Sequence, residues 1–187
     1  LKSGVVHVVD VDIKGYFDSI PHQRLMELVK ERIADGRVLS LIESFLKQKV
    51  MDPLGWIAVE EQDEGTPQGG VISPLLANIY LNPLDHLMSE QGHQMVRYAD
   101  DMVILCPTRE AAEEVLKQLG EWCSQAGLEL HTEKTRVVDM GQPKAAFEFL
   151  GYQFWRGKTS GDIRRFIRPK SEKKFRAEIK PLTKRTS

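Results

Sequence analysis

The chain has 187 residues, of which 41% are hydrophobic, so it can bury one sizeable core with room for a small appendage. Its longest apolar runs fall far short of the roughly 20 residues that cross a membrane and no signal peptide is visible, which excludes a membrane protein and predicts a soluble intracellular one. Residues 1–155 carry 14 Lys and Arg against 24 Asp and Glu, whereas residues 156–187 carry 12 Lys and Arg against 3 Asp and Glu. The basic C-terminal segment is therefore either a polyphosphate-binding surface or a solvated tail.

The first part of the chain reads as one buried strand followed by helices. A nearly continuous, β-branched apolar run predicts a strand over 5–12. Because this strand follows almost directly on Leu1, which is not a methionine, we expect the chain to be a piece of a longer protein. Apolar residues at helical spacing then predict helices over 22–34 and 37–48.

The next segment is rich in turn residues and leads into a third helix. A short strand is predicted over 55–59, followed by an acidic loop with Gly and Pro over 60–70. The dipeptide Ser73-Pro74 predicts the helix start, with Ser73 as the N-cap and Pro74 at the first helical position. Pro83 lies inside this helix and is expected to bend it.

The second half of the chain mixes strands and helices without a strict βαβ order. A hairpin is expected around Asp100 and Asp101, followed by a helix over 109–126. Strands are then predicted over the ranges 128–131, 135–140, 146–155 and 163–168, and a basic helix over 171–180. The predicted fold class is therefore α+β, with a small antiparallel sheet packed on helices.

Neither the cysteines nor the histidines are spaced as metal ligands. Cys106 and Cys123 have no CxxC or Cys/His neighbour, so we expect buried free thiols in a reducing compartment. The five histidines are likewise expected to have structural or surface roles. The acids are the remaining candidates for a metal site.

Two adjacent acids at the predicted hairpin tip, Asp100 and Asp101, indicate such a site. Side-by-side carboxylates between apolar strands repel each other, and a divalent cation neutralises them most simply. A third acid ends the first strand: Asp12, or Asp10, which shares its strand face by the two-residue period. Two-metal phosphoryl transfer needs carboxylates that hold cations about 3.5–4 Å apart. Strand geometry alone leaves Asp10 and Asp12 as alternatives.

Five short motifs follow one another along the chain. They are VDIKGYFD at 11–18, GTPQGGVISPLLAN at 65–78, YADD at 98–101, LELHTEKT at 128–135 and FLGY at 149–152. In this order they resemble the motifs of reverse transcriptases, and most closely those of the enzymes encoded by bacterial group II introns. The resemblance implies a polymerase palm with part of the fingers over 1–168 and the start of the thumb over 169–187, and it selects Asp12 over Asp10.

The resemblance also implies roles for individual side chains. Asp12, Asp100 and Asp101 match the catalytic, metal-binding acids. Five further residues match substrate-binding positions: Phe17 beneath the incoming sugar, Gln68 in the template and nucleotide loop, Tyr98 in the YADD motif, Lys134 near the leaving pyrophosphate, and Gly151 in the hairpin that grips the primer end. Plain structural roles are the alternatives: a core aromatic for Phe17, a turn residue for Gln68 and a surface lysine for Lys134.

Family membership implies an RNA-directed DNA polymerase that uses two Mg²⁺ ions, with Mn²⁺ as a substitute. Its partners would be an RNA template (the intron RNA), a DNA primer and deoxynucleoside triphosphates in the bacterial cytoplasm. Because the family's N-terminal fingers portion and most of the thumb are missing, this piece is expected to have little or no activity by itself. Two alternatives stay open: a non-catalytic RNA-binding maturase scaffold, and a reverse transcriptase of another bacterial lineage, such as a retron, diversity-generating or CRISPR-associated enzyme.

Overall fold

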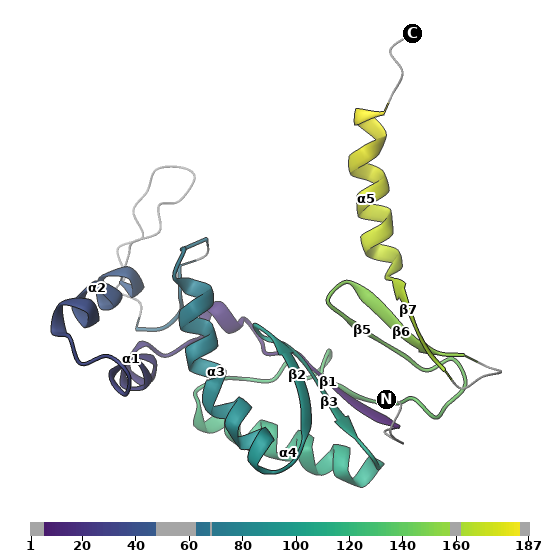
Figure 1. Ribbon diagram of the computed structural model, residues 1–187, viewed down its shortest axis with the longest axis horizontal. Helices are drawn as coiled ribbons and strands as arrows, with labels where there is room; N and C mark the ends of the chain where they lie inside the picture. Colours follow the sequence, from purple (N-terminus) through teal and green to yellow (C-terminus); the bar gives the residue numbers. More distant parts are fainter. Residues whose placement is uncertain (1–5, 48–62, 68, 158–161, 184–187) are drawn as a thin grey trace.

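A computed structural model describes residues 6–47, 63–67, 69–157 and 162–183, and it combines helices with two small antiparallel sheets (Figure 1). In chain order the elements are β1 (His7–Val11), a short 3₁₀ helix (Tyr16–Asp18), α1 (His22–Lys30), α2 (Gly36–Leu46), α3 (Ser73–Glu90), β2 (Gln94–Tyr98), β3 (Asp101–Cys106), α4 (Arg109–Gln125), β4 (Arg136–Asp139), β5 (Ala146–Phe149), β6 (Tyr152–Arg156), β7 (Ile163–Ile167) and α5 (Pro169–Leu182). The predicted α+β class is confirmed. Within the described residues, none of the helices is both long and apolar enough to span a membrane.

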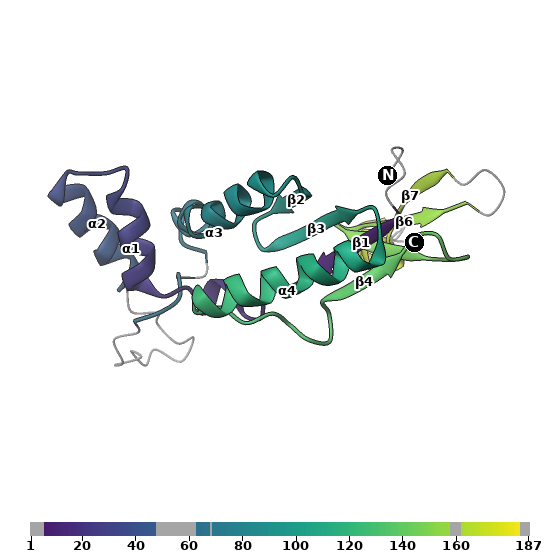
Figure 2. The same ribbon diagram turned by 90° about the horizontal axis from the view of Figure 1, so that it is seen from below.

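Four antiparallel strands in the order β2-β3-β1-β4 form the central sheet. Successive side chains of a strand point to opposite faces, so Val9 and Val11 of β1 share one face with Met102 and Ile104 of β3. All four are buried, and helices α3 and α4 pack against this face (Figure 2). This contact makes up the larger part of the hydrophobic core.

The opposite face of the central sheet is covered only in part. Val8 and Val103 lie on that face in a second core, together with Phe147 and Phe149 from the three-stranded sheet β5-β6-β7. The acids at the ends of β1 and β3 lie on the same face, beyond this apolar contact. The second sheet therefore leaves the acidic end of the central sheet open.

One predicted strand is in fact two. The range 146–155 divides into β5 and β6, which are joined by a two-residue turn at Leu150 and Gly151. Their φ angles are 49° and 79°, and two successive positive φ angles give the turn whose twist matches that of the flanking strands. The prediction of one continuous strand was wrong because Leu150, a residue that rarely adopts a positive φ, hides the turn signal.

The segment 128–131 forms no strand, contrary to the prediction. Only Leu130 makes an isolated bridge, to Ile13, because β1 ends at Val11 and the chain beyond it departs from the ladder. The strand predicted over 55–59 lies outside the described residues. The strands predicted over 135–140 and 163–168 correspond to β4 and β7.

The start of α3 differs from its prediction. Ile72 is the N-cap, and Ser73 is already helical; its hydroxyl donates to the Pro67 carbonyl at 2.7 Å. Ser73 therefore fixes the preceding loop instead of capping the helix. The helix continues through Pro83, and its ribbon changes direction along its length (Figure 1).

Helix α5 begins at Pro169, two residues before the predicted start, with proline in the first turn. No residue of α5 is buried, and the helix projects away from both sheets (Figure 1). The helix predicted over 22–34 ends earlier, at Lys30.

Both cysteines are buried free thiols, as the sequence predicts. Burial raises the pKa of Cys123 to about 11 and also raises the pKa of Cys106. Because the thiolate is the reactive form, we expect neither thiol of the native protein to react with a thiol reagent at pH 8, whereas both should react in denaturant. Counting labelled thiols by mass spectrometry tests this, and fast labelling of either native thiol would contradict it.

Candidate active site

Asp12 and Asp101 come together because β1 and β3 pair in an antiparallel register. The last registered pair is Val11 with Met102, and Asp12 and Asp101 are the residues directly beyond it. Both residues line the same cleft, and the Asp12 carboxylate contributes to raising the pKa of Asp101. The structure thus brings two of the three predicted catalytic acids to one place.

Asp100, the third acid, occupies the turn between β2 and β3. Tyr98 pairs with Asp101, so Ala99 and Asp100 are the two turn residues, and Ala99 has a φ of 54°. A positive φ at the first turn position suits a two-residue hairpin between twisted strands. Asp100 therefore adjoins the facing pair of acids.

Arg97 ties this turn to helix α3. Its guanidinium donates to both carboxylate oxygens of Asp85, with a distance of 2.7 Å from Nε to Oδ1. Its Nη1 also donates to the side-chain oxygen of Asn78 and to the Ala99 carbonyl, at 2.9 Å each. The Arg97 side chain is only 11% exposed, and its hydrogen bond to Asp85 raises its pKa. The turn that carries Asp100 is therefore held by a charged, nearly buried side chain.

Asp12 is held by the segment that follows α4. The Nζ of Lys134 lies 3.2 and 3.3 Å from the two carboxylate oxygens of Asp12. The Thr135 hydroxyl accepts from the Asp12 N–H at 3.3 Å and donates to the Asp12 carbonyl at 3.2 Å. The His131 N–H donates to the same carbonyl at 2.8 Å. These contacts fix the Asp12 backbone and place a positive charge against its carboxylate.

Asp10, the alternative acid of this strand face, has a different environment. It lies opposite Val103, two residues further from the turn that holds Asp100, and its Oδ2 is 3.2 Å from the Nε of Arg136. Burial raises the pKa of Asp10, and the hydrogen bond from Arg136 opposes that rise. Position along the strand therefore favours Asp12 as the partner of Asp101.

Asp101 also contacts the second sheet. The backbone amide of Leu150, at the tip of the β5–β6 turn, donates to its carboxylate. Burial raises the pKa of Asp101, the neighbouring carboxylates of Asp100 and Asp12 raise it further, and the Leu150 amide opposes them. A carboxylate in this environment is stabilised by a nearby positive charge.

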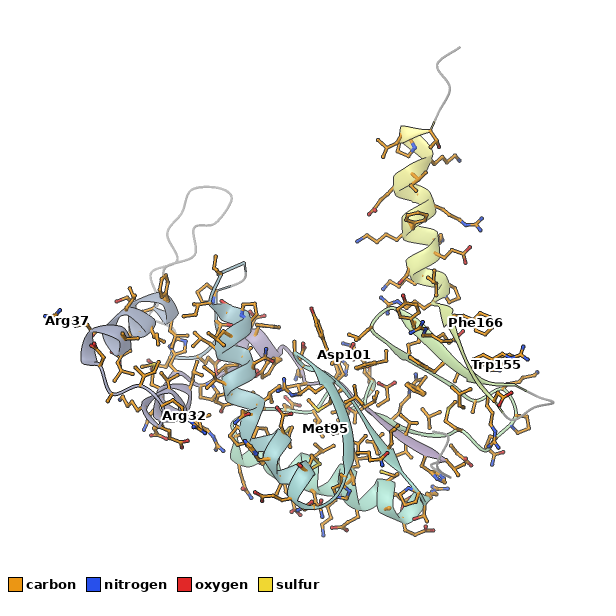
Figure 3. All side chains as sticks on the ribbon, viewed as in Figure 1. Arg32, Arg37, Met95, Asp101, Trp155 and Phe166 are labelled. Atoms are coloured by element: carbon orange, nitrogen blue, oxygen red, sulfur yellow. The ribbon has the colours of Figure 1, made fainter. Side chains whose placement is uncertain are left out.

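A cleft of about 500 Å³ separates the central sheet from the β5–β6 turn. Its charged lining residues are the acids Asp10, Asp12, Asp101, Glu133 and Glu148 and the cations Lys134, Arg136 and Arg168. Figure 3 shows Asp101 between α3 on one side and the β5-β6-β7 sheet on the other. The excess of acids makes the cleft a favourable place for cations.

Three of the predicted substrate residues lie at or beside this cleft. Lys134, from the segment after α4, and Gly151, from the β5–β6 turn, both line it. Tyr98 lies opposite Asp101 in the β2–β3 pair and is 69% exposed. An exposed aromatic ring beside the acids is available to a substrate.

The other two predicted substrate residues are not placed in the cleft. Phe17 is partly buried in the 3₁₀ helix, where it packs on the core and contacts Tyr16 edge to face, with the ring centroids 5.5 Å apart. Its carbonyl accepts from the Thr66 amide at 2.6 Å, which attaches the loop before α3 to the 3₁₀ helix. Gln68 lies outside the described residues.

The acids suit a hard divalent cation. Mg²⁺ and Mn²⁺ prefer carboxylate oxygens, and the Lys134 ammonium already lies against both oxygens of Asp12. In the part of the chain that the structure describes, no group of three or more His, Cys, Asp or Glu side chains is close enough to hold an ion unaided. Mg²⁺ usually takes one or two protein carboxylates and completes its shell with substrate phosphates and water. The acids therefore fit a cation that binds together with substrate.

Three supporting contacts were not predicted from the sequence: the Arg97 bridge, the Thr135 hydrogen bonds and the Leu150 amide. The sequence contains a weak signal for the Arg97 contact. Arg97 is a charged residue in an otherwise largely apolar strand, and the two-residue period puts it on the same, helix-covered face as Met95. Thr135 ends a motif, which marks the segment but not the contact. Leu150 gives no signal, since its role depends on a backbone amide.

Comparison with known proteins agrees with this arrangement. Residues 1–154 match the family described as reverse transcriptase (RNA-dependent DNA polymerase). Protein YkfC of Escherichia coli is 29% identical over 193 residues, which cover 84% of this chain and 49% of the relative. The group II intron-encoded protein LtrA of Lactococcus lactis is 47% identical over 77 residues, which cover 41% of this chain and 12% of LtrA. The chain therefore spans about half, or much less, of the length of these relatives.

Solved structures share the fold. An apo telomerase from Candida tropicalis, truncated from the C-terminal domain, superposes with a TM-score of 0.68 at 15% identity, covering 87% of this chain and 36% of that one. A Candida albicans telomerase in complex with a TWJ fragment of telomeric RNA superposes with a TM-score of 0.67 at 17% identity. The match covers 88% of this chain and 31% of that telomerase chain. These structures show that the chain shares its fold with telomerases. The chain belongs to the reverse transcriptase family.

Proposed function

We propose that the protein containing this chain is an RNA-directed DNA polymerase whose active site is the cleft lined by Asp12 and Asp101, with Asp100 in the adjoining turn. The observation that carries this proposal is the register of β1 with β3, whose last pair, Val11 with Met102, brings Asp12 and Asp101 to the same end of the sheet. The substrates are a DNA primer, an RNA template and deoxynucleoside triphosphates. By analogy with LtrA, the template is the intron RNA, and the protein also assists its splicing.

The three acids would hold two Mg²⁺ ions, with Mn²⁺ as a substitute. When bound, these ions would activate the primer 3′-oxygen and stabilise the leaving pyrophosphate. The side chains of the cleft have complementary tasks. The Leu150 amide orients the Asp101 carboxylate, and the Leu150–Gly151 turn lies where it can support the primer end. The Lys134 side chain is 59% exposed, so its ammonium can exchange its contact with Asp12 for water and offset negative charge on the departing phosphates.

Primer extension on an RNA template tests the proposal. The protein containing this chain is expected to extend a DNA primer with Mg²⁺ or Mn²⁺, and the Asp12→Asn and Asp100→Asn variants are expected to lose that extension. Asp139→Asn, which changes a carboxylate at the opposite end of the central sheet, is the matched control and should retain activity. If RNA binding and splicing assistance persist without any DNA synthesis that depends on these acids, the protein is a non-catalytic maturase scaffold and the proposal is wrong.

Lys134 gives a second prediction, because its ammonium competes with a cation for Asp12. The Lys134→Gln variant is expected to reach half-maximal extension at a lower Mg²⁺ concentration than the wild type, while its maximal rate falls by about 10-fold through loss of the charge near the phosphates. A Mg²⁺ titration of primer extension measures both quantities. Lys14→Gln is the control, since Lys14 forms a similarly exposed pair with Glu129 at 3.0 Å. An unchanged Mg²⁺ requirement would show that Lys134 does not occupy the cation position.

A further inference from the structure

The outer face of the β5-β6-β7 sheet carries an aromatic pair that the active site does not use. Alternation along the strands turns Phe147 and Phe154 toward the second core, where their rings stack with centroids 5.0 Å apart. The same alternation turns Trp155 and Phe166 to the opposite face. Neither of these two residues is among the described residues that line the cleft.

The two rings form a contact of their own. The Trp155 and Phe166 centroids are 6.1 Å apart with an angle of 56° between the ring planes. Phe166 is 50% exposed and Trp155 is partly exposed. Figure 3 shows both side chains on the side of the sheet that faces away from α1, α2 and α3. They present aromatic surface to solvent at a place remote from α1 and α2.

The outer face around this pair carries one guanidinium and one carboxylate. Arg164 lies directly opposite Trp155 in the β6–β7 pair and therefore shares its face, and Glu148, opposite Gln153 in the β5–β6 pair, shares it too. Glu148 pairs with Arg168 at 3.6 Å, whereas among the described residues no carboxylate forms an ion pair with Arg164. The segment from residue 156 to the end carries 12 Lys and Arg against 3 Asp and Glu. The face thus combines exposed aromatic rings with an uncompensated guanidinium inside a strongly basic segment.

We propose that this outer face binds single-stranded nucleic acid, with unpaired bases stacking on Trp155 and Phe166 and Arg164 holding a phosphate. The basic charge complements a polyanion, and aromatic rings beside arginine are the combination that binds unpaired bases without sequence preference. A duplex offers no free base face to such rings, which favours a single strand. RNA and DNA single strands share this chemistry, so the test includes both.

The first measurement is tryptophan fluorescence. A template–primer duplex is added to saturation so that the polymerase cleft is filled, and a single strand of about six uridines or thymidines is then titrated in. Stacking on Trp155 is expected to quench the emission. Trp155→Phe removes the reporter but keeps an aromatic ring, so this variant should bind the oligonucleotide by polarisation while losing the quench. The readout does not require DNA synthesis, so it is independent of the proposed activity.

Two variants test the individual contacts. Phe166→Leu keeps an apolar side chain but removes the ring, and it should weaken binding of the oligonucleotide by roughly 5- to 100-fold. Arg164→Gln should lower the slope of log affinity against log salt by about 0.7. Lys117→Gln, on the outside of α4, is the charge-matched control and should leave the slope unchanged.

The result also separates RNA from DNA and from other occupants. Tighter binding of the uridine strand would identify RNA as the partner, and equal binding would identify single strands in general; either supports the proposal. Absence of the quench with both strands, or equal binding by wild type and Phe166→Leu, overturns it. A dimer that Phe166→Leu dissociates, seen by sedimentation without any response to the oligonucleotides, would instead assign the face to a second copy of the chain.

Discussion

Asp101→Asn is expected to lower the rate of primer extension by about 100-fold or more while making the fold more stable at neutral pH. Loss of activity follows because an amide is a poor ligand for a hard cation and because the change removes one of the negative charges that line the cleft. Stability rises because burial and the carboxylates of Asp100 and Asp12 oppose ionisation of Asp101 in the folded state. Asparagine keeps the shape and an oxygen that accepts from the Leu150 amide.

The stability gained in Asp101→Asn is expected to increase as the pH rises. The folded-state pKa of Asp101 lies above its ordinary value of 3.8, so the folded protein binds more protons than the unfolded chain between those two pKa values. The Asp101 contribution to the free energy of unfolding therefore falls as the pH rises through that window. The stability difference between Asp101→Asn and wild type should be largest at neutral pH and should vanish below about pH 3.8. Denaturant unfolding at a series of pH values measures it.

Asp139→Asn is the matched control for this experiment. Hydrogen bonds from the Gln142 side chain and the Gly141 amide lower the pKa of Asp139, so its ionised form is favoured in the folded state. The contribution of Asp139 is present above its ordinary pKa and is lost as the pH falls through the lowered one. Asp139→Asn should therefore reduce stability slightly at neutral pH. If both variants changed stability in the same direction, the like-charge explanation for Asp101 would be wrong.

Arg97→Leu is expected to reduce both stability and activity. The substitution leaves the Asp85 carboxylate without its partner. Breaking a fully buried ion pair costs more than this, because Asp85 is 34% exposed although Arg97 is nearly buried. We therefore expect the free energy of unfolding to fall by about 2 kcal/mol. For a chain of this size that corresponds to about 4–8 °C in Tm. The Ala99 carbonyl loses its donor as well, so the turn with Asp100 is no longer fixed and primer extension should fall by about 100-fold.

Two variants separate these effects. Arg97→Leu combined with Asp85→Leu removes the unpaired charge and should recover most of the stability but not the activity, because the Ala99 carbonyl still lacks its donor. Arg109→Leu breaks an exposed pair with Glu113 and should change the free energy of unfolding by less than about 0.5 kcal/mol. Recovery of activity together with stability in the double variant would show that Arg97 acts only on the fold.

Local patterns in the sequence were sufficient for most elements and for placing candidate acids at the end of the first strand and at the hairpin. Each of two elements buries one face: the apolar run before Asp12 and helix α4. Such periodicity can be recognised from residues only a few positions apart in the chain. Adjacent carboxylates flanked by apolar residues were likewise recognisable as a place where charge must be neutralised. The local pattern predicted one strand over 146–155, and only the family resemblance placed Gly151 in a hairpin, because the turn at Leu150 depends on a backbone angle that leucine rarely adopts.

The choice between Asp10 and Asp12 from geometry needed the tertiary structure. Periodicity states which residues share a face, but it does not state which residue of another strand lies opposite, and a shift of register would pair different side chains. Here the register ends at Val11 and Met102, which leaves Asp12 and Asp101 together at the end of the sheet, and Thr135, 123 positions away, fixes the Asp12 backbone. The Arg97 bridge to Asp85 and the Leu150 amide on Asp101 arise in the same way. Such contacts join elements distant in the chain, so they depend on how the sheets and helices pack and leave no trace in any one segment.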